Sequence, residues 1–112
     1  MVLIILSTLL FSPAAFSQGV TGAITGVVMD PQQAAVAGAK VTVTNVETGS
    51  VNTTETNSSG VYNVPSLRIG TYEIRVEAAG FKTYVQQNVA IEVARVVRVD
   101  PVLEIGAVGD SV

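Results

Sequence analysis

The side chains that could perform acid–base or metal chemistry are few and scattered in this sequence. It contains no Cys and no His, so it lacks a thiolate nucleophile and the side chain most often used for proton transfer near neutral pH. The nearest carboxylates are Glu73 and Glu77, with Arg75 between them. Alternation places all three on the solvent face of one strand, whereas sugar hydrolysis needs two carboxylates flanking a cleft. The sequence therefore predicts no catalytic residue, no cofactor and no enzyme activity.

Oxygen atoms that could bind a hard cation such as Ca²⁺ occur in the expected loops. They belong to Asp30, Asn45, Glu47 and Asn57. Asp and Asn in loops more commonly close turns, because their side-chain oxygen accepts hydrogen bonds from nearby backbone N–H groups. We therefore assign these residues to turns and expect no metal site.

One aromatic ring is a candidate for contact with a carbohydrate ligand. Tyr84 is out of phase with Phe81, which predicts an exposed ring, and Gln86 lies on the same face. A sugar site needs such a ring beside polar side chains, but the sequence has no Trp to extend the platform. Carbohydrate binding through Tyr84 and Gln86 is therefore the alternative hypothesis, and it rests mainly on analogy of fold.

Contact with a protein partner is the leading hypothesis. The segment Val51–Thr56 is polar on both faces and is expected to form a strand at a sheet edge. Such an edge has spare backbone donors and acceptors to which a partner can add a strand. Only 13% of the residues are charged, the net charge is −3, and the six basic residues are scattered. These features exclude nucleic acid and an anionic membrane surface as expected partners.

The N-terminal residues differ in composition from the rest of the chain. The run from Met1 to Phe16 is almost entirely apolar. Small residues at Ala15 and Ser17 fit the two positions that a signal peptidase reads, which predicts a signal peptide over residues 1–17. The exported mature chain would then contain no transmembrane span and lie in the periplasm or at the outer-membrane surface.

A transmembrane anchor is the rival interpretation of this N-terminal run. A spanning helix needs roughly 20 apolar residues, and Ser12 and Pro13 interrupt this shorter run. No Lys or Arg precedes it, which leaves open a start codon upstream of Met1.

The rest of the chain alternates between apolar and polar residues with a period of two, which is typical of half-buried strands. Val and Thr dominate, and their β-branched side chains suit a pleated surface. Seven short strands separated by turn residues predict an all-β fold, a seven-stranded antiparallel Greek-key β-sandwich over residues 18–103. The expected strands are Gly22–Met29, Ala39–Val46, Val51–Thr56, Val61–Val64, Thr71–Ala78, Phe81–Val93 and Val96–Leu103.

Two of these strands have specific expected features. Pro65 should end the fourth strand, because proline cannot donate a ladder hydrogen bond. The long sixth strand should contain a bulge near residues 86–88.

Several short motifs, taken in order, resemble the carboxypeptidase regulatory-like domain family. They are GVVMD at 26–30, VAGAKVTVTN at 36–45, TNSSGVY at 56–62, PSLRIGTY at 65–72 and AAGF at 78–81. The matched residues serve turns and core packing, so no carboxypeptidase activity is carried over with the name. The motif residues are Gly26, Asp30, Gly38, Asn45, Gly60, Tyr62, Pro65, Leu67, Gly70, Tyr72, Gly80 and Phe81.

The resemblance has implications for fold and context. It implies a transthyretin-like (prealbumin-like) sandwich, a fold also grouped with carbohydrate-binding-like domains. Such domains form N-terminal extensions of outer-membrane TonB-dependent receptors, in which a plug and a barrel follow. This sequence ends at Val112, so we expect residues 104–112 to be a tail or linker and expect no barrel in the chain. The implied partner is a protein of the cell envelope or the parent receptor itself.

Overall fold

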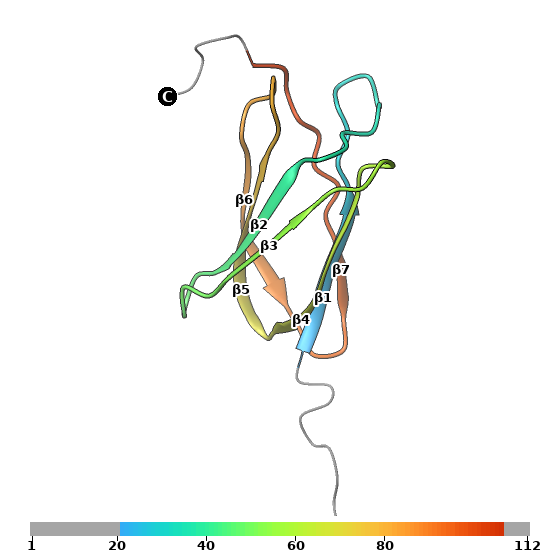
Figure 1. Cartoon of the computed structure of the whole chain (residues 1–112). Coiled ribbons are helices and arrows are strands. Elements are labelled where there is room, and N and C mark those ends of the chain that lie inside the picture. The colour runs from blue at the N-terminus through green and yellow to red at the C-terminus, as the bar shows by residue number, and fades with distance from the viewer. Residues whose placement is uncertain (1–20, 107–112) are drawn as a thin grey trace, which may run out of the picture.

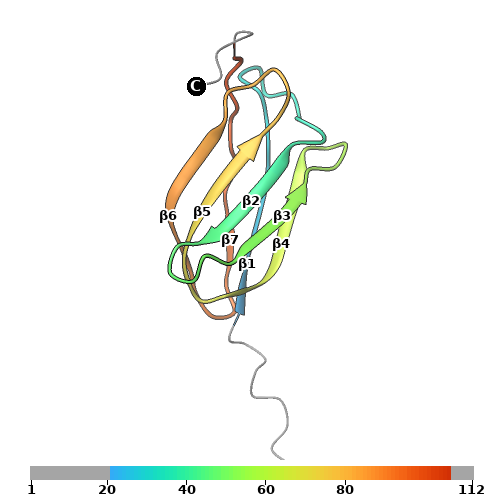
Figure 2. The same ribbon diagram turned by 60° about the vertical axis from the view of Figure 1, so that its left-hand side comes forward.

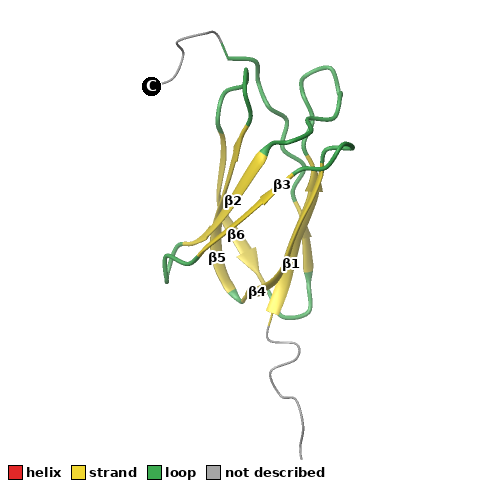
Figure 3. Cartoon of the chain, in the orientation of Figure 1, coloured by secondary structure: helices red, strands yellow, loops and turns green. Residues whose placement is uncertain are grey.

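The computed structural model describes residues 21–106, so the predicted signal peptide lies outside the described residues. Within that range the chain forms strands joined by turns and loops, with no helix (Figures 1 and 3). This confirms the predicted all-β class. The strands are β1 (Thr21–Val27), β2 (Lys40–Asn45), β3 (Val51–Glu55), β4 (Val61–Arg68), β5 (Gly70–Glu77), β6 (Tyr84–Ile91) and β7 (Val96–Arg98).

The strands form two sheets that pack face to face, which confirms the predicted seven-stranded β-sandwich. One sheet has the order β4-β1-β7 and the other the order β3-β2-β5-β6. Figure 2 shows the broad four-stranded sheet in front of the three-stranded one. Both sheets contribute to a core of buried side chains that includes Ile24, Val28, Val41, Val43, Tyr62, Leu67, Tyr72, Ile74, Val76, Val89, Ile91, Val99 and Leu103.

The register of the larger sheet follows directly from the alternation in the sequence. Val41 pairs with Val76 and Val43 with Ile74, and all four side chains are buried. A shift of one residue would turn this entire set toward solvent and bring charged side chains into the core. The predicted solvent face of β5, which carries Glu73, Arg75 and Glu77, is therefore confirmed.

One strand pair differs in direction from the prediction. The sequence predicts an antiparallel sandwich, but β1 and β7 run parallel, with Ala23 opposite Val96 and Thr25 opposite Arg98. The alternation of apolar and polar residues reports which face of a strand is buried, not the direction of its neighbour. The prediction of antiparallel pairing throughout is wrong at this one pair.

Strand β4 also continues past the residue that was expected to end it. Ile24 pairs with Val64 and Gly22 with Leu67, so Ala23 faces two residues, Pro65 and Ser66. This is a bulge, and Ser66 adopts a positive φ of 59° within it. Because β4 lies at the edge of its sheet, the missing N–H of proline is tolerated there. The prediction that Pro65 ends the strand is wrong for this reason.

The bulge predicted in β6 is confirmed. Tyr72 pairs with Val89 and Ile74 with Gln86, so Glu73 alone faces Gln87 and Asn88. Asn88 has a positive φ of 61°, as expected for the extra residue of a bulge. The strand itself is shorter than expected and begins at Tyr84.

The C-terminal residues that were expected to be a tail or linker pair with the loop between β5 and β6. The backbone N–H of Lys82 donates to the Glu104 carbonyl at 2.8 Å, and that of Gly106 donates to the Gly80 carbonyl at 3.1 Å. Phe81 and Ile105 form an antiparallel bridge between these hydrogen bonds. Ordered pairing with the sandwich therefore extends to Gly106.

The two ends of the described chain lie at opposite ends of the sandwich. β1 begins at the lower end in Figures 1 and 2, and the segment that follows β7 leaves at the upper end. The described chain therefore enters the sandwich at one end and leaves it at the other.

Candidate functional site

The predicted ligand contacts, Tyr84 and Gln86, lie side by side on β6. The Tyr84 hydroxyl donates a hydrogen bond to Gln86 Oε1 at 2.6 Å. Gln86 is exposed, but Tyr84 is half-buried and packs against the core. Partial burial raises the pKa of the Tyr84 hydroxyl above its ordinary value. The expected exposure of this ring is therefore wrong in part, because one side of the ring is covered by the core.

The register of β6 explains this burial. Tyr84 lies opposite Val76 and Gln86 opposite Ile74, and directly opposed residues in an antiparallel pair project to the same face. Both side chains therefore project from the inward face of β6, where Val76 and Ile74 are buried. β6 is an edge strand, which is why Gln86 reaches solvent. A ligand role for these two residues stays a prediction.

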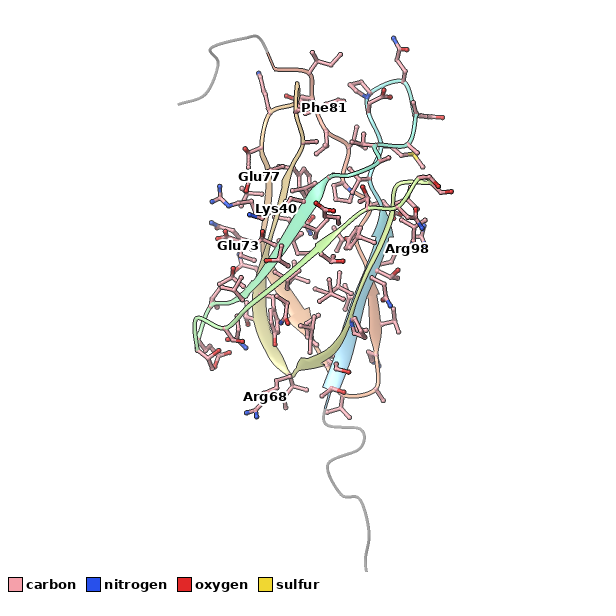
Figure 4. All side chains as sticks on the ribbon, viewed as in Figure 1. Lys40, Arg68, Glu73, Glu77, Phe81 and Arg98 are labelled. Carbon is pink, nitrogen blue, oxygen red and sulfur yellow. The ribbon has the colours of Figure 1, made fainter. Side chains whose placement is uncertain are left out.

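The acidic residues considered for catalysis lie on the outer face of the four-stranded sheet. Lys40, Glu73 and Glu77 project away from the core (Figure 4). Lys40 pairs in register with Glu77, and Arg75 Nη2 lies 3.8 Å from Glu73 Oε1. These side chains place charges of both signs on the outer face of the sheet. The carboxylates do not converge on a shared position there.

Three of the four residues considered as cation ligands close turns with their side-chain oxygens. Asp30 Oδ1 accepts from the N–H groups of Gln32 and Ala34, both at 2.9 Å. Asn45 Oδ1 accepts from Glu47 and Thr48. These contacts hold the loops after β1 and β2.

Asn57 performs the same role in the loop between β3 and β4. Its Oδ1 accepts from the N–H groups of Ser59 and Val61 at 2.9 and 3.0 Å. The following Gly60 has a φ of 75°, and a Cβ there would lie 2.6 Å from the Val28 carbonyl oxygen. Conformation and space therefore both require glycine at this position. In residues 21–106 no group of three or more acidic side chains is placed to hold a metal ion.

Among the glycines of residues 21–106, the first family motif residue, Gly26, leaves the least room for a side chain. A Cβ at Gly26 would lie 1.7 Å from the Val99 carbonyl oxygen, far inside van der Waals contact. The Tyr62 hydroxyl donates to that same carbonyl at 2.6 Å. Burial, followed by the nearby Asp100 charge, raises the pKa of Tyr62 well above its ordinary range. Tyr62 thus stays neutral and anchors the chain after β7 to the core.

Asp100, the residue after Val99, adds a side-chain contact to the same region. Its Oδ1 accepts from the Val27 N–H at 2.9 Å, and its Oδ2 accepts from Arg98 Nε at 2.9 Å. The Val27 hydrogen bond is the main reason that the pKa of Asp100 is lowered, and Arg98 adds to the effect. No local pattern signals this role, because Val27 and Asp100 are far apart in sequence.

The motif residues therefore build turns, a tight backbone approach and a closed core. Among the described residues, no buried side-chain nitrogen or oxygen lacks a hydrogen-bond partner. The same residues hold no helix that is long and apolar enough to cross a membrane. Fold and motif together define a small β-sandwich module.

A family model agrees with this definition. The model of the carboxypeptidase regulatory-like domain matches residues 23–104, and the chain belongs to that family. The resemblance predicted from the motifs is thereby confirmed.

A curated relative of this chain is a much longer protein. The chain is 33% identical over 110 residues to the TonB-dependent transporter Oar of Myxococcus xanthus. The match covers 97% of this chain and 10% of the transporter, so the chain spans about a tenth of that relative's length.

Two solved structures share the fold at low sequence identity. A putative carbohydrate binding protein from Bacteroides uniformis is 19% identical with a TM-score of 0.61, over 76% of this chain and 42% of that one. The catechol 1,2-dioxygenase of Acinetobacter radioresistens is 13% identical with a TM-score of 0.65, over 81% of this chain and 54% of that one. Likeness at this level of identity extends to the β-sandwich fold and not to the activity of either protein.

Proposed function

We propose that this chain is an exported, non-catalytic interaction and spacer module of the cell envelope, of the kind that forms the N-terminal extension of a TonB-dependent transporter. The observation that carries this proposal is the 33% identity to such a transporter, which covers nearly this whole chain but a tenth of the relative. The likeness indicates a module of a larger outer-membrane protein.

The arrangement of polar side chains supports a role without catalysis. The carboxylates of Glu73 and Glu77 point away from the core with Arg75 between them. The oxygens of Asp30, Asn45 and Asn57 already accept backbone hydrogen bonds within their own loops. These oxygens therefore already have a structural role in their own loops.

Strand β3 supports a role in contact with another protein. It lies at the edge of the four-stranded sheet and pairs on one side with β2. Val51, Asn52 and Thr53 are all exposed along this edge. A strand from a partner could therefore pair with the outer side of β3 without displacing any part of the core.

The location can be tested by expressing the whole chain in a Gram-negative host and fractionating the cells. We expect a mature protein that begins at Gln18 in the periplasmic or outer-membrane fraction, as read by intact mass. Ala15→Leu is the matched control, because a bulky residue at that position should block cleavage. An unprocessed wild-type chain that remains in the cytosol would contradict the proposal.

Carbohydrate binding is the alternative, and Tyr84 offers a direct test of it. Affinity electrophoresis through gels that contain envelope polysaccharides should show no retention of the wild-type chain. Retention that is lost in Tyr84→Ala and kept in Tyr84→Phe would instead establish the ring as a sugar contact. The Phe variant retains the ring and removes only the hydroxyl that bonds to Gln86.

A further inference from the structure

The first and last segments of the described sandwich run side by side in the same direction. We call this pairing, between residues 21–29 and 94–103, the terminal seam. β1 and β7 form its centre, with Ala23, Ile24 and Thr25 opposite Val96, Val97 and Arg98. Backbone hydrogen bonds extend it at both ends: Ala94 N–H to Thr21 O, Ala23 N–H to Arg95 O, Val99 N–H to Thr25 O, Met29 N–H to Pro101 O and Leu103 N–H to Met29 O, all between 2.8 and 3.0 Å.

Side chains strengthen the middle of the seam. Asp100 Oδ1 accepts from the Val27 N–H at 2.9 Å and so supplies a hydrogen bond just beyond the end of β7. The Tyr62 hydroxyl holds the Val99 carbonyl from within the core. On its other side β1 pairs with β4 along its full length. Sliding of β1 along its axis would therefore break contacts with two neighbouring strands together.

The direction of the seam matters because the ends of the described chain lie at opposite ends of the sandwich (Figures 1 and 2). Tension between these ends pulls β1 toward its own start and pulls the chain after β7 the other way. The two parallel segments are then displaced along their length. All hydrogen bonds of the seam share such a load, whereas a pull on both strands from one end would open them one at a time.

We propose that the terminal seam makes this module a force-bearing connector that resists extension between its two ends. The inference rests on the proposed spacer function in one respect, since a spacer is attached at both of its ends. The short pairing of Gly80–Lys82 with Glu104–Gly106 lies outside the seam. It opens first under load and lets the strain reach the seam at Leu103.

The test is single-molecule force spectroscopy on the full chain, pulled in two directions. Handles on the two chain termini load the seam along its length. A handle on the N-terminus and one on Val93→Cys pull the same seam apart from its lower end, because residue 93 directly precedes the seam segment 94–103 and lies three residues before β7. The sequence has no natural Cys to interfere with this attachment. Val93 is exposed in a turn, and Val96→Cys provides a second attachment point at an exposed residue should the first variant fail to fold.

We expect the rupture force between the termini to be at least about twofold higher than that from Val93→Cys at the same loading rate, because several hydrogen bonds must break together. Equal forces in the two directions would overturn the proposal. The measurement uses purified protein, so a failure here is separate from a failure of the proposed envelope location.

A pair of variants tests the side-chain contribution to the seam. Asp100→Ala removes the acceptor of the Val27 N–H, and Glu77→Ala removes an exposed carboxylate from the outer face of the other sheet. We expect Asp100→Ala to lower the rupture force between the termini and to leave the force from Val93→Cys unchanged. Glu77→Ala should change neither force. An identical terminus-to-terminus force in Asp100→Ala and Glu77→Ala would contradict the role assigned to Asp100.

Discussion

The terminal seam and strand β3 each include an edge strand, β7 in one sheet and β3 in the other, but the two edges have different surroundings. The seam brings two distant segments into backbone contact at Gly26 and buries Val28, Val99 and Leu103 beside it. β3 has one neighbouring strand, and its Val51 side chain is 57% exposed. The comparison indicates that fold stability is concentrated where the chain closes on itself. The β3 edge remains available for contact with a partner.

Substitution of Gly26 should have the largest effect on the stability of the seam. A methyl group in Gly26→Ala would lie 1.7 Å from the Val99 carbonyl oxygen, and only separation of β1 from the chain after β7 relieves the clash. We expect a loss of more than about 3 kcal/mol in the free energy of unfolding, at the upper end of single-residue effects. Urea denaturation followed by circular dichroism measures this loss.

Gly49→Ala is the matched control for Gly26→Ala. Gly49 has a φ of 77° and open space around it, so a methyl group there adds backbone strain but no clash. The expected cost is about 1–2 kcal/mol, the usual penalty for a left-handed alanine. Equal destabilisation by the two variants would show that the close approach of Gly26 to Val99 adds nothing to the free energy of unfolding beyond an ordinary backbone effect.

Removal of the Tyr62 hydroxyl tests the same seam and should cost less stability than Gly26→Ala. Tyr62→Phe leaves the Val99 carbonyl without its 2.6 Å donor in a site where the tyrosine is 1% exposed. We expect a cost of about 1–3 kcal/mol, the penalty for a buried acceptor that loses its partner.

Tyr72→Phe provides the comparison for Tyr62→Phe, because its hydroxyl donates at 2.8 Å to the partly buried Arg68 carbonyl near the β4–β5 turn. Water can replace a partner more easily there, so a loss of about 0.5–1.5 kcal/mol is expected. If Tyr72→Phe proves the more costly of the two, the seam is not the dominant polar contact of the core.

Much of the fold can be predicted from the sequence because alternation is a local property. The buried faces of β2 and β5 and the bulge at Gln87–Asn88 follow from residue order and turn chemistry alone. The parallel direction of β7 cannot be predicted in this way, since it depends on where a distant segment leaves the sandwich. The continuation of β4 through Pro65 likewise depends on the position of that strand at a sheet edge.

The candidate site shows the same division between local and distant information. The turn-forming roles of Asp30 and Asn57 are encoded by neighbours within a few residues. The position of Tyr84 against the core depends on its register with β5, and the contact of Asp100 with Val27 joins residues 73 positions apart in the sequence. Contacts of this second kind have no signature in a single sequence.

The charge of Asp100 should make the stability of the seam depend on pH. Its folded-state pKa lies below the ordinary value near 3.8, so the unfolded chain takes up the proton first as the solution is acidified. The stabilisation is therefore complete above about pH 4 and is lost as pH falls through the folded-state pKa. Asp100→Asn should lower the urea midpoint at pH 7, and its difference from the wild-type chain should shrink at lower pH.

Solvent limits the size of this pH effect. The Asp100 side chain is 45% exposed in its pair with Arg98, so screening weakens the charge contribution. We expect a smaller change at pH 7 than in Tyr62→Phe. A difference between Asp100→Asn and the wild-type chain that stays constant from pH 7 to pH 2 would show that charge at the seam does not contribute to stability.

The smallest effect on stability is expected at the β3 edge of the four-stranded sheet. Thr53 lies in the exposed middle of β3, opposite Thr42 of β2, and Thr53→Lys should change the free energy of unfolding by no more than about 0.5 kcal/mol. A charged lysine on an edge strand also disfavours pairing with another strand. The variant therefore separates the two properties: thermal denaturation should be unaltered while any strand addition at β3 is weakened. A large loss of stability in Thr53→Lys would place β3 within the cooperative core and remove the contrast with the terminal seam.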